Sequence, residues 1–305
     1  ECNERYNKCR VKLFSHRENR VHPQKDDKIL TDWNGLMISA IARAASVLDN
    51  TKYKAAAFNA AEFSIKNLIS TDEKSENYLY KLHRNGISAK MGLIEDYSFM
   101  LWAYIEMYQM TFDSKYLEIS QNIADHMIDH FWDEEGWSFY FTPDYGEELI
   151  VRAKEVYDGA IPSGNSVAAY NLVRLSRILS DPKYEGYCNK ILTTSSRRLN
   201  GSGSGKSMMM QAVQNMNGPS YEVLVIGNSD SSEYIDLIDS IRKSSQINKV
   251  VIAYDKEKNT EIENLIPFIT EFPRGDSGEP LVYVCQDYSC QLPTSDINQV
   301  LKQLE

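Results

Sequence analysis

The sequence predicts a mainly α-helical fold, part of an (α/α) six-hairpin toroid, followed by a small α/β subdomain. Residues 1–217 contain three helix pairs, each an apolar helix followed by an amphipathic one. The turn within each pair repeats an Asp shortly before a Lys-Tyr dipeptide, with the tyrosines at Tyr53, Tyr116 and Tyr184. Residues 218–305 change to short apolar runs typical of strands. An open α-solenoid is the alternative, but bulky apolar helices and strands inserted between the pairs favour the toroid.

The first pair is predicted at 33–48 and 53–69. Residues 33–48 are apolar around most of the helical circumference, so this helix should be buried on most sides. Residues 53–69 have an amphipathic pattern and should lie outside it. Alternating apolar residues at 77–86 predict a strand.

The second and third pairs repeat this plan. We expect inner helices at 94–110 and 164–179, and outer helices at 115–131 and 184–199. An aromatic strand is expected within 136–142. The three Asp-Lys-Tyr turns should lie on the face opposite the polar loops that precede the inner helices.

The C-terminal part should form a small, mainly parallel sheet. The stretch Gly201–Gly205 is expected to be flexible, and the sequence leaves open whether it is natural or engineered. A helix at 208–216 then precedes the subdomain. Its predicted elements are strands at 221–226, 249–254 and 281–285 and a helix at 231–243.

Composition excludes several classes of protein. The 305 residues are 42% hydrophobic and 25% charged, as in soluble globular proteins. The net charge is −10 and the longest basic run is Arg197-Arg198, so we expect neither nucleic acid nor membrane as a partner. No uninterrupted apolar segment has the length of a membrane span. Gly227 stands alone, without a dinucleotide or phosphate fingerprint, so no cofactor is expected.

The termini and the cysteines indicate a cytoplasmic location. The polar N-terminal segment lacks a signal-peptide core, and without an initiator Met it resembles a cut end. Five cysteines form a sparse, odd set that suits a reducing compartment. We interpret Cys285 and Cys290 as ordinary thiols rather than half of a zinc site.

Three histidines are candidate site residues. His126 and His130 are four apart on one helix, which is compatible with metal binding, but they join a polar stripe and are interpreted as surface residues. No metal site is therefore expected. His83 lies at a strand end near the polar loops. It could serve a structural role or face a site.

The polar loops 22–34, 83–97 and 152–166 all precede inner helices, so their side chains should converge at one end of the arc, which we call the mouth. Carboxylates beside aromatic rings are typical of carbohydrate sites. The predicted catalytic residues are Asp32, Glu95, Asp96 and Asp158. The predicted substrate-binding residues are Trp33, Asn34, His83, Tyr97, Arg152, Ser163 and Asn165. The alternative is that residues such as Asp32, Asp96 and Ser163 only cap helices.

Several strings resemble a known family. Residues 26–37 (DDKILTDWNGLM), 95–97 (EDY), 158–166 (DGAIPSGNS) and 283–293 (YVCQ…CQLP) are similar, in order, to the spermatogenesis-associated protein 20 family. The resemblance implies a thioredoxin-like N-terminal domain, a six-hairpin toroid similar to N-acylglucosamine 2-epimerases, and a C-terminal α/β segment. This chain resembles the C-terminal half of that arrangement. The missing N-terminal half, with the first hairpins, is then an expected partner and should leave an exposed apolar flank here.

Two functions remain open. In the first, the toroid is an enzyme acting on a small carbohydrate, as an isomerase, epimerase or glycosidase. In the second, it is a non-catalytic module that recognises clients for a redox domain. Carboxyl groups with pKa values pushed apart favour the enzyme, whereas acids that all cap helices favour the module.

Overall fold

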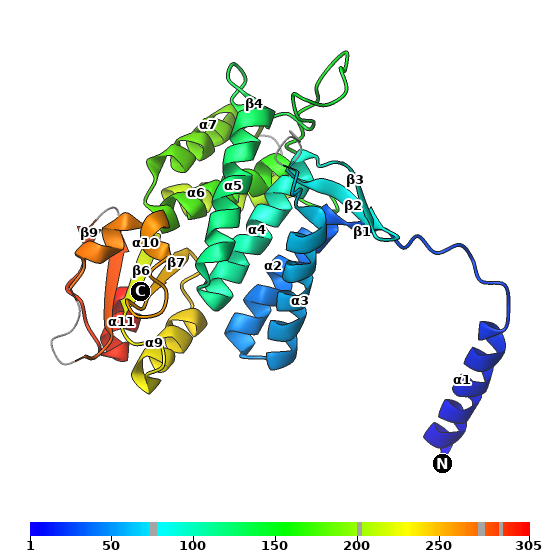
Figure 1. The fold of residues 1–305 in the computed structure, drawn as a ribbon, viewed down its shortest axis with the longest axis horizontal. Helices are drawn as coiled ribbons and strands as arrows, with labels where there is room; N and C mark the ends of the chain where they lie inside the picture. The colour runs from blue at the N-terminus through cyan, green and yellow to red at the C-terminus, as the bar shows by residue number, and fades with distance from the viewer. Residues whose placement is uncertain (73–77, 200–202, 274–277, 287–288) are drawn as a thin grey trace.

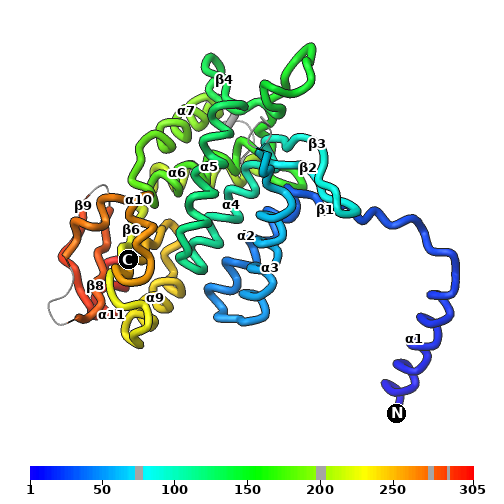
Figure 2. The backbone as a smooth tube through the Cα atoms, in the orientation of Figure 1, coloured from blue at the N-terminus to red at the C-terminus, as the bar shows by residue number. Residues whose placement is uncertain are grey.

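The computed structural model describes residues 1–72, 78–199, 203–273, 278–286 and 289–305 (Figure 1). Helix α1 (Cys2–Glu18) has no buried residue and lies apart from the rest of the molecule. The remaining chain forms an arc of helices followed by a small mixed sheet with its own helices. The tube in Figure 2 follows this path from the isolated helix through the arc to the C-terminus.

The arc consists of three helical hairpins, as the sequence predicts. The inner helices are α2 (Thr31–Leu48), α4 (Ile94–Thr111) and α6 (Gly164–Leu179). The outer helices are α3 (Thr51–Leu68), α5 (Ser114–Phe131) and α7 (Pro182–Leu199). Helix α4 packs between α2 and α6. The α2–α3 turn lies at the end of the arc opposite β1–β3 in Figure 1.

Burial differs strongly among the inner helices. Almost every residue of α4 and α6 is buried, whereas only one side of α2 is. The expectation that 33–48 is buried on most sides is therefore wrong, because no described element covers its second side. Six large apolar side chains of the first hairpin are at least 43% exposed: Trp33, Met37, Val47, Leu48, Tyr53 and Phe58.

Short strands lie over the mouth. A three-stranded antiparallel sheet is ordered β1-β2-β3. Its strands are β1 (Ile29–Leu30), β2 (Tyr80–Arg84) and β3 (Ile87–Met91). The predicted strand at 77–86 therefore belongs to a hairpin, with residue 77 outside the described part. The aromatic stretch at 136–142 contributes only β5 (Ser138–Phe139), which pairs with β4 (Trp132–Asp133).

The C-terminal sheet is mixed, so the prediction of a mainly parallel sheet is wrong. Its order is β7-β6-β8-β9. Strands β6 (Tyr221–Ile226) and β7 (Lys249–Tyr254) are parallel, but β8 (Leu281–Gln286) runs antiparallel to β6. The single crossover helix α9 (Ser232–Lys243) requires only the first pair to be parallel. Strand β8 begins at the edge of the sheet where β6 and β7 end, since Ile226 pairs with both Tyr254 and Leu281. It therefore runs in the opposite direction.

Smaller helices complete this part of the chain. Residues 201 and 202 of the glycine-serine stretch lie outside the described residues, and η1 (Gly203–Lys206) leads into α8. The other elements are α8 (Ser207–Asn217), α10 (Ile262–Leu265), η2 (Pro267–Glu271), β9 (Ser289–Cys290) and α11 (Ile297–Gln303).

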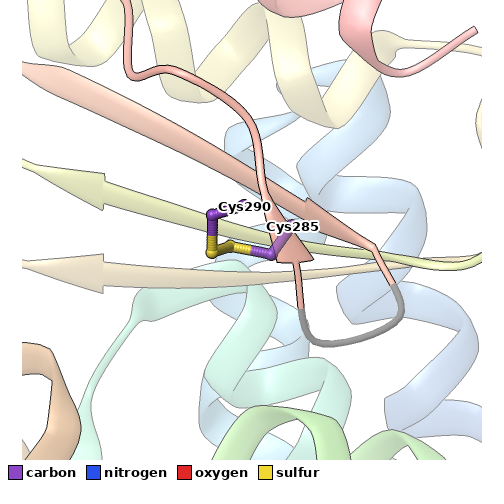
Figure 3. The surroundings of a disulfide bond; sticks show 2 residues. All are labelled: Cys285 and Cys290. Carbon is purple, nitrogen blue, oxygen red and sulfur yellow. A yellow bond between two sulfur atoms is a disulfide. The ribbon is translucent and has the colours of Figure 1, made fainter.

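Cys285 and Cys290 form a disulfide, so their interpretation as ordinary thiols is wrong (Figure 3). Cys285 is in β8 and Cys290 in β9, and the antiparallel register places the two residues opposite each other. Their Cα atoms are 3.9 Å apart. This proximity depends on the pairing of β8 with β9, which cysteine spacing does not reveal. Cys2, Cys9 and Cys188 are free thiols.

The second and third Lys-Tyr pairs join neighbouring outer helices. In both cases a carboxylate on the preceding outer helix accepts bonds from the ammonium and from the phenol. We call the two sets acid–Lys–Tyr clusters: Glu62 with Lys115 (2.8 Å) and Tyr116 (2.9 Å), and Asp125 with Lys183 (2.9 Å) and Tyr184 (2.8 Å). The sequence repeat is thus a repeated contact between hairpins.

The clusters predict unequal effects of removing one phenol oxygen. Tyr116→Phe should lower the free energy of unfolding by about 1 kcal/mol, because Glu62 loses a hydrogen-bond donor. Tyr53→Phe is the matched control, since Tyr53 is exposed and no described residue accepts a bond from its phenol. It should change the free energy of unfolding by less than about 0.5 kcal/mol. Urea denaturation of both variants measures the difference, and equal losses would contradict the role assigned to the cluster.

Candidate functional site

Two glycines let the inner helices approach each other closely at the mouth. A Cβ atom on Gly35 of α2 would lie 2.6 Å from the carbonyl carbon of Phe99 in α4. A Cβ atom on Gly164, the first residue of α6, would lie 2.8 Å from Cγ2 of Ile94. Any larger residue would force the backbones apart. The N-terminal ends of α2, α4 and α6 are therefore held together, with the β1–β3 sheet over them.

Lys81 of β2 joins two of the predicted acids. Its Nζ lies 2.7 Å from Oδ2 of Asp32 and 3.1 Å from Oδ1 of Asp96. The backbone N–H of Asp32 also donates to Asp96 Oδ1 at 3.0 Å. The first turns of α2 and α4 are thus connected through one cation and one carboxylate.

Asp96 is fully buried within this cluster. Besides Lys81, its carboxylate accepts the backbone N–H of Leu93 at 2.8 Å, which caps α4. Burial raises the pKa of Asp96 to about 7, although Lys81 and the Leu93 N–H favour the charged form. Burial opposes the charge on Lys81, but the two carboxylates outweigh it and raise the pKa of the ammonium.

Glu95 differs from both neighbours because no described residue pairs with its carboxyl group. The side chain is half-buried. Burial raises its pKa, and the negative charges of Asp32 and Glu155 raise it further, against an opposite effect of Lys81. Glu95 therefore combines a raised pKa with a carboxyl group that no described residue pairs, two properties that suit a general acid.

Trp33 and Asn34 follow Asp32 at the rim of the mouth. The Trp33 side chain is 61% exposed, so its ring is available for stacking. Asn34 is partly buried, and its amide nitrogen donates to the backbone oxygen of Leu30 at 2.7 Å. Trp33 is thus open to a ligand, whereas the amide of Asn34 is tied to the first turn of α2.

The third loop supplies framework rather than free polar groups. Asp158 accepts backbone N–H bonds with both oxygens, from Ser163 at 3.0 Å and from Met208 and Met209 at 2.8 and 3.1 Å. Ser163 caps α6. Asn165 is fully buried and bonds to the backbone of Phe139. These bonds position the loop and α8, and they leave Asp158 no free oxygen for proton transfer.

Three further predicted binding residues point elsewhere. Tyr97 is fully buried, and its phenol oxygen accepts the N–H groups of residues 78 and 79, so it cannot be a stacking wall. His83 bonds to Ser88 and packs edge-on against Phe63 of α3. The guanidinium of Arg152 donates to backbone oxygens of residues 130 and 142 and lies over the ring of Tyr140. It braces the loops instead of balancing the mouth acids.

The interpretation of His126 as a surface residue is wrong. Its ring stacks on Tyr97, with centroids 5.0 Å apart and planes 3° apart, and its Nε2 lies 3.2 Å from the phenol oxygen of Tyr145. Burial, with a contribution from the nearby His130, lowers the pKa of His126 to about 4. The imidazole is therefore neutral at pH 7. The tight α5–loop packing that buries it cannot be read from a polar stripe.

Lys81 is the main site residue that sequence reasoning missed. The predicted alternation of Tyr78, Tyr80 and Leu82 already places Lys81 on the opposite face of the strand. A lone cation on a strand between loops rich in acids was the signal that could have found it. Among the described residues, no group of three or more His, Cys, Asp or Glu side chains is arranged to hold a metal ion.

The chain matches part of a known protein. It is 27% identical over 302 residues to spermatogenesis-associated protein 20 of Rattus norvegicus and 26% identical to the Homo sapiens protein, in both cases over 96% of this chain. This confirms the resemblance inferred from the sequence strings. The chain spans only 38% of the length of each of these relatives. No protein-family model matches it.

Solved structures confirm the toroid fold. Cellobiose 2-epimerase from Bacillus thermoamylovorans aligns with a TM-score of 0.53 and 12% identity, over 88% of this chain and 67% of that one. A GH76 α-mannanase of Bacteroides thetaiotaomicron aligns with a TM-score of 0.50 and 14% identity, over 74% of this chain and 60% of that one. At such identities the likeness concerns the fold. Within the described residues, no helix combines the length and apolar character needed to cross a membrane.

Removing Lys81 should have a pH-dependent effect on stability. In Lys81→Met, the carboxylates of Asp32 and Asp96 lose their shared cation, and the pKa of Asp96 rises further above its unfolded value. Protonation then relieves the repulsion, so the variant should lose stability as pH rises from about 4 through 7. We expect a loss of about 3 kcal/mol at pH 8 and a smaller one at pH 5.

The matched control is Lys90→Met on the adjacent strand β3, where the side chain is exposed. Its unfolding midpoint should follow that of the unmodified protein at every pH. Urea unfolding at pH 5, 6, 7 and 8 makes the comparison. A pH-independent loss in Lys81→Met would show that Lys81 acts by packing alone.

Proposed function

We propose that the mouth is the site of a carbohydrate-active domain, with Glu95 as the general acid. The observation that carries the proposal is the contrast between Glu95, which is unpaired and has a raised pKa, and Asp32, which Lys81 pairs at 2.7 Å. Carboxyl groups in unlike environments divide naturally into an acid and an anion. The sugar epimerase and mannanase that share the fold support a carbohydrate as the ligand.

The residues suit glycosidic bond cleavage better than isomerisation. Protonated Glu95 would donate its proton to the leaving-group oxygen. Asp32, paired with Lys81, would stabilise positive charge on the sugar or activate water. The exposed ring of Trp33 would stack on a sugar face. An isomerase needs a base for a carbon-bound proton, and His83, the histidine proposed for the mouth, bonds instead to Ser88.

In a longer protein of the kind that the relatives represent, residues outside this chain would also contribute to the site. More than half of each relative's length has no counterpart here, since the match covers 38% of those proteins. We place the missing N-terminal half, with its thioredoxin-like domain and first hairpins, beside the open flank of α2 and α3. That half would form the other wall of the mouth and contribute further residues to the site.

A recognition module is the second candidate, and one observation favours it. Asp158, Ser163 and Asn165 direct their polar groups to backbone atoms of the protein itself. A mouth with one free carboxyl group and one exposed ring could bind a sugar or a client without chemistry. Turnover separates this candidate from the enzyme.

The decisive variant is Glu95→Gln, which keeps the shape of the side chain and removes the proton donor. We expect kcat to fall by at least about 100-fold, the usual contribution of a general acid, with KM changed by less than about threefold. The assay uses the protein joined to its N-terminal half and a panel of mono- and disaccharides. Activity should also decline as pH rises above the pKa of Glu95.

Glu155→Gln is the matched control. Glu155 is exposed and contributes only its charge to raising the pKa of Glu95. This variant should retain kcat at low pH and lose activity at a lower pH than the unmodified protein. Unchanged kcat in Glu95→Gln would remove Glu95 from the mechanism. Saturable sugar binding without turnover by the unmodified protein would establish the recognition module.

A further inference from the structure

A polar cavity lies near the ends of the inner helices opposite the mouth, where α2, α4 and α6 meet the segment joining α9 to β7. Its volume is about 260 Å³. Five cationic side chains line it, against a single carboxylate from Glu106. We call it the cationic cavity and define it by these cations: Arg43, Arg174, Arg242, Lys243 and Lys249.

Three of the five cations form no ion pair with a described residue. Arg174 pairs with Glu106, at 2.8 Å, and thereby engages the one lining acid. Neither Arg43 nor Lys243 forms an ion pair with any described residue. The ammonium of Lys249 donates only to the backbone oxygens of residues 244 and 246. The concentration of cations is notable in a chain with a net charge of −10.

Helix capping explains only part of the cluster. Arg242 donates to the backbone oxygens of Gln109 and Met110, each at 2.8 Å, and so closes the C-terminal end of α4. Its Nε is buried and has no hydrogen-bond partner within the described part of the chain. The nearest carboxylate of its own helix, Asp239, is 4.0 Å away. Lys249 has a similar role, since its ammonium bonds to backbone oxygens just after α9. Arg43 and Lys243 have no such bond to a described residue.

The environment of Lys249 shows that these cations oppose one another. Burial, with a contribution from the positive charge of Arg43, lowers the pKa of Lys249 to about 8. An anion between the two side chains would remove this repulsion and favour the charged ammonium.

We propose that the cationic cavity binds a small phosphate-type oxyanion, either inorganic phosphate or a phosphate monoester. Guanidinium and ammonium groups arriving from α2, α9 and β7 surround the space from several sides, which suits an anion with several equivalent oxygens. The volume is below the roughly 300–1,000 Å³ of pockets for drug-sized ligands, so the ligand is compact. Binding would connect the helical arc to the C-terminal subdomain.

Calorimetric titration of the 305-residue protein tests the proposal. Inorganic phosphate and glycerol 3-phosphate are titrated separately at low ionic strength, with malonate as the carboxylate comparison. We expect one saturable site for at least one phosphate ligand, at least tenfold weaker binding of malonate, and weakening as salt is added. Tighter binding of glycerol 3-phosphate identifies a monoester ligand, and equal or tighter binding of inorganic phosphate identifies the free anion.

Two variants locate the site. Arg43→Met and Lys249→Met should each weaken phosphate binding by at least tenfold, whereas Lys256→Met, which removes an exposed lysine away from the cavity, should stay within twofold. Arg43 is exposed, so its replacement leaves the fold intact even if Lys249→Met is destabilised.

The result that overturns the proposal is the absence of saturable phosphate binding, or affinity in Arg43→Met equal to that of the unmodified protein. Glu95→Gln should bind phosphate normally. The two sites can therefore fail independently.

Discussion

Helix α4 is the element on which the rest of the structure depends. It is buried along nearly its whole length, and the other inner helices pack on two sides of it. Gly35 and Gly164 permit backbone contact at its first turns, which no other residue type would allow without displacement. Because these contacts fix the N-terminal ends of three helices at one place, the mouth has a defined geometry before any ligand binds.

The same helix carries two acids with opposite environments in consecutive positions. Asp96 points into the protein, where it caps α4 and shares Lys81 with Asp32. Glu95 feels the charges of Lys81 and Asp32 but remains unpaired among the described residues. One lysine thus makes two carboxylates different from a third, and the difference arises from which side of a helical turn each acid occupies. A single change at Lys81 should therefore affect stability and chemistry together.

Sequence periodicity was sufficient for the helical part and insufficient for the pairings. All six helices of the arc begin within two residues of their predicted starts, because apolar spacing and Asp or Asn caps are local signals. The direction of β8 and the Cys285–Cys290 disulfide depend on which strands pair and in which direction. Strand pairing leaves no periodic pattern in the sequence.

The site was predictable by location rather than by role. The loops that precede the inner helices do meet, yet Asp158 caps α8, a helix 50 residues further along the chain. Tyr97 illustrates the same limit: its position in the loop was predicted, but its burial beneath residues 78 and 79 was not. Which polar group caps and which remains free is decided by neighbours that are distant in the sequence.

The acid–Lys–Tyr clusters give the arc a direction. Glu62 and Asp125 each lie eleven residues after the first residue of their helix, and the Lys-Tyr pair always occupies the second and third positions of the next outer helix. At one end of the arc, Lys52 and Tyr53 present the donor half of this contact to solvent. At the other end, the corresponding position of α7 is Thr193, which has no carboxylate. The donor pair of this contact is therefore repeated on all three outer helices, whereas the carboxylate is present on the first two only.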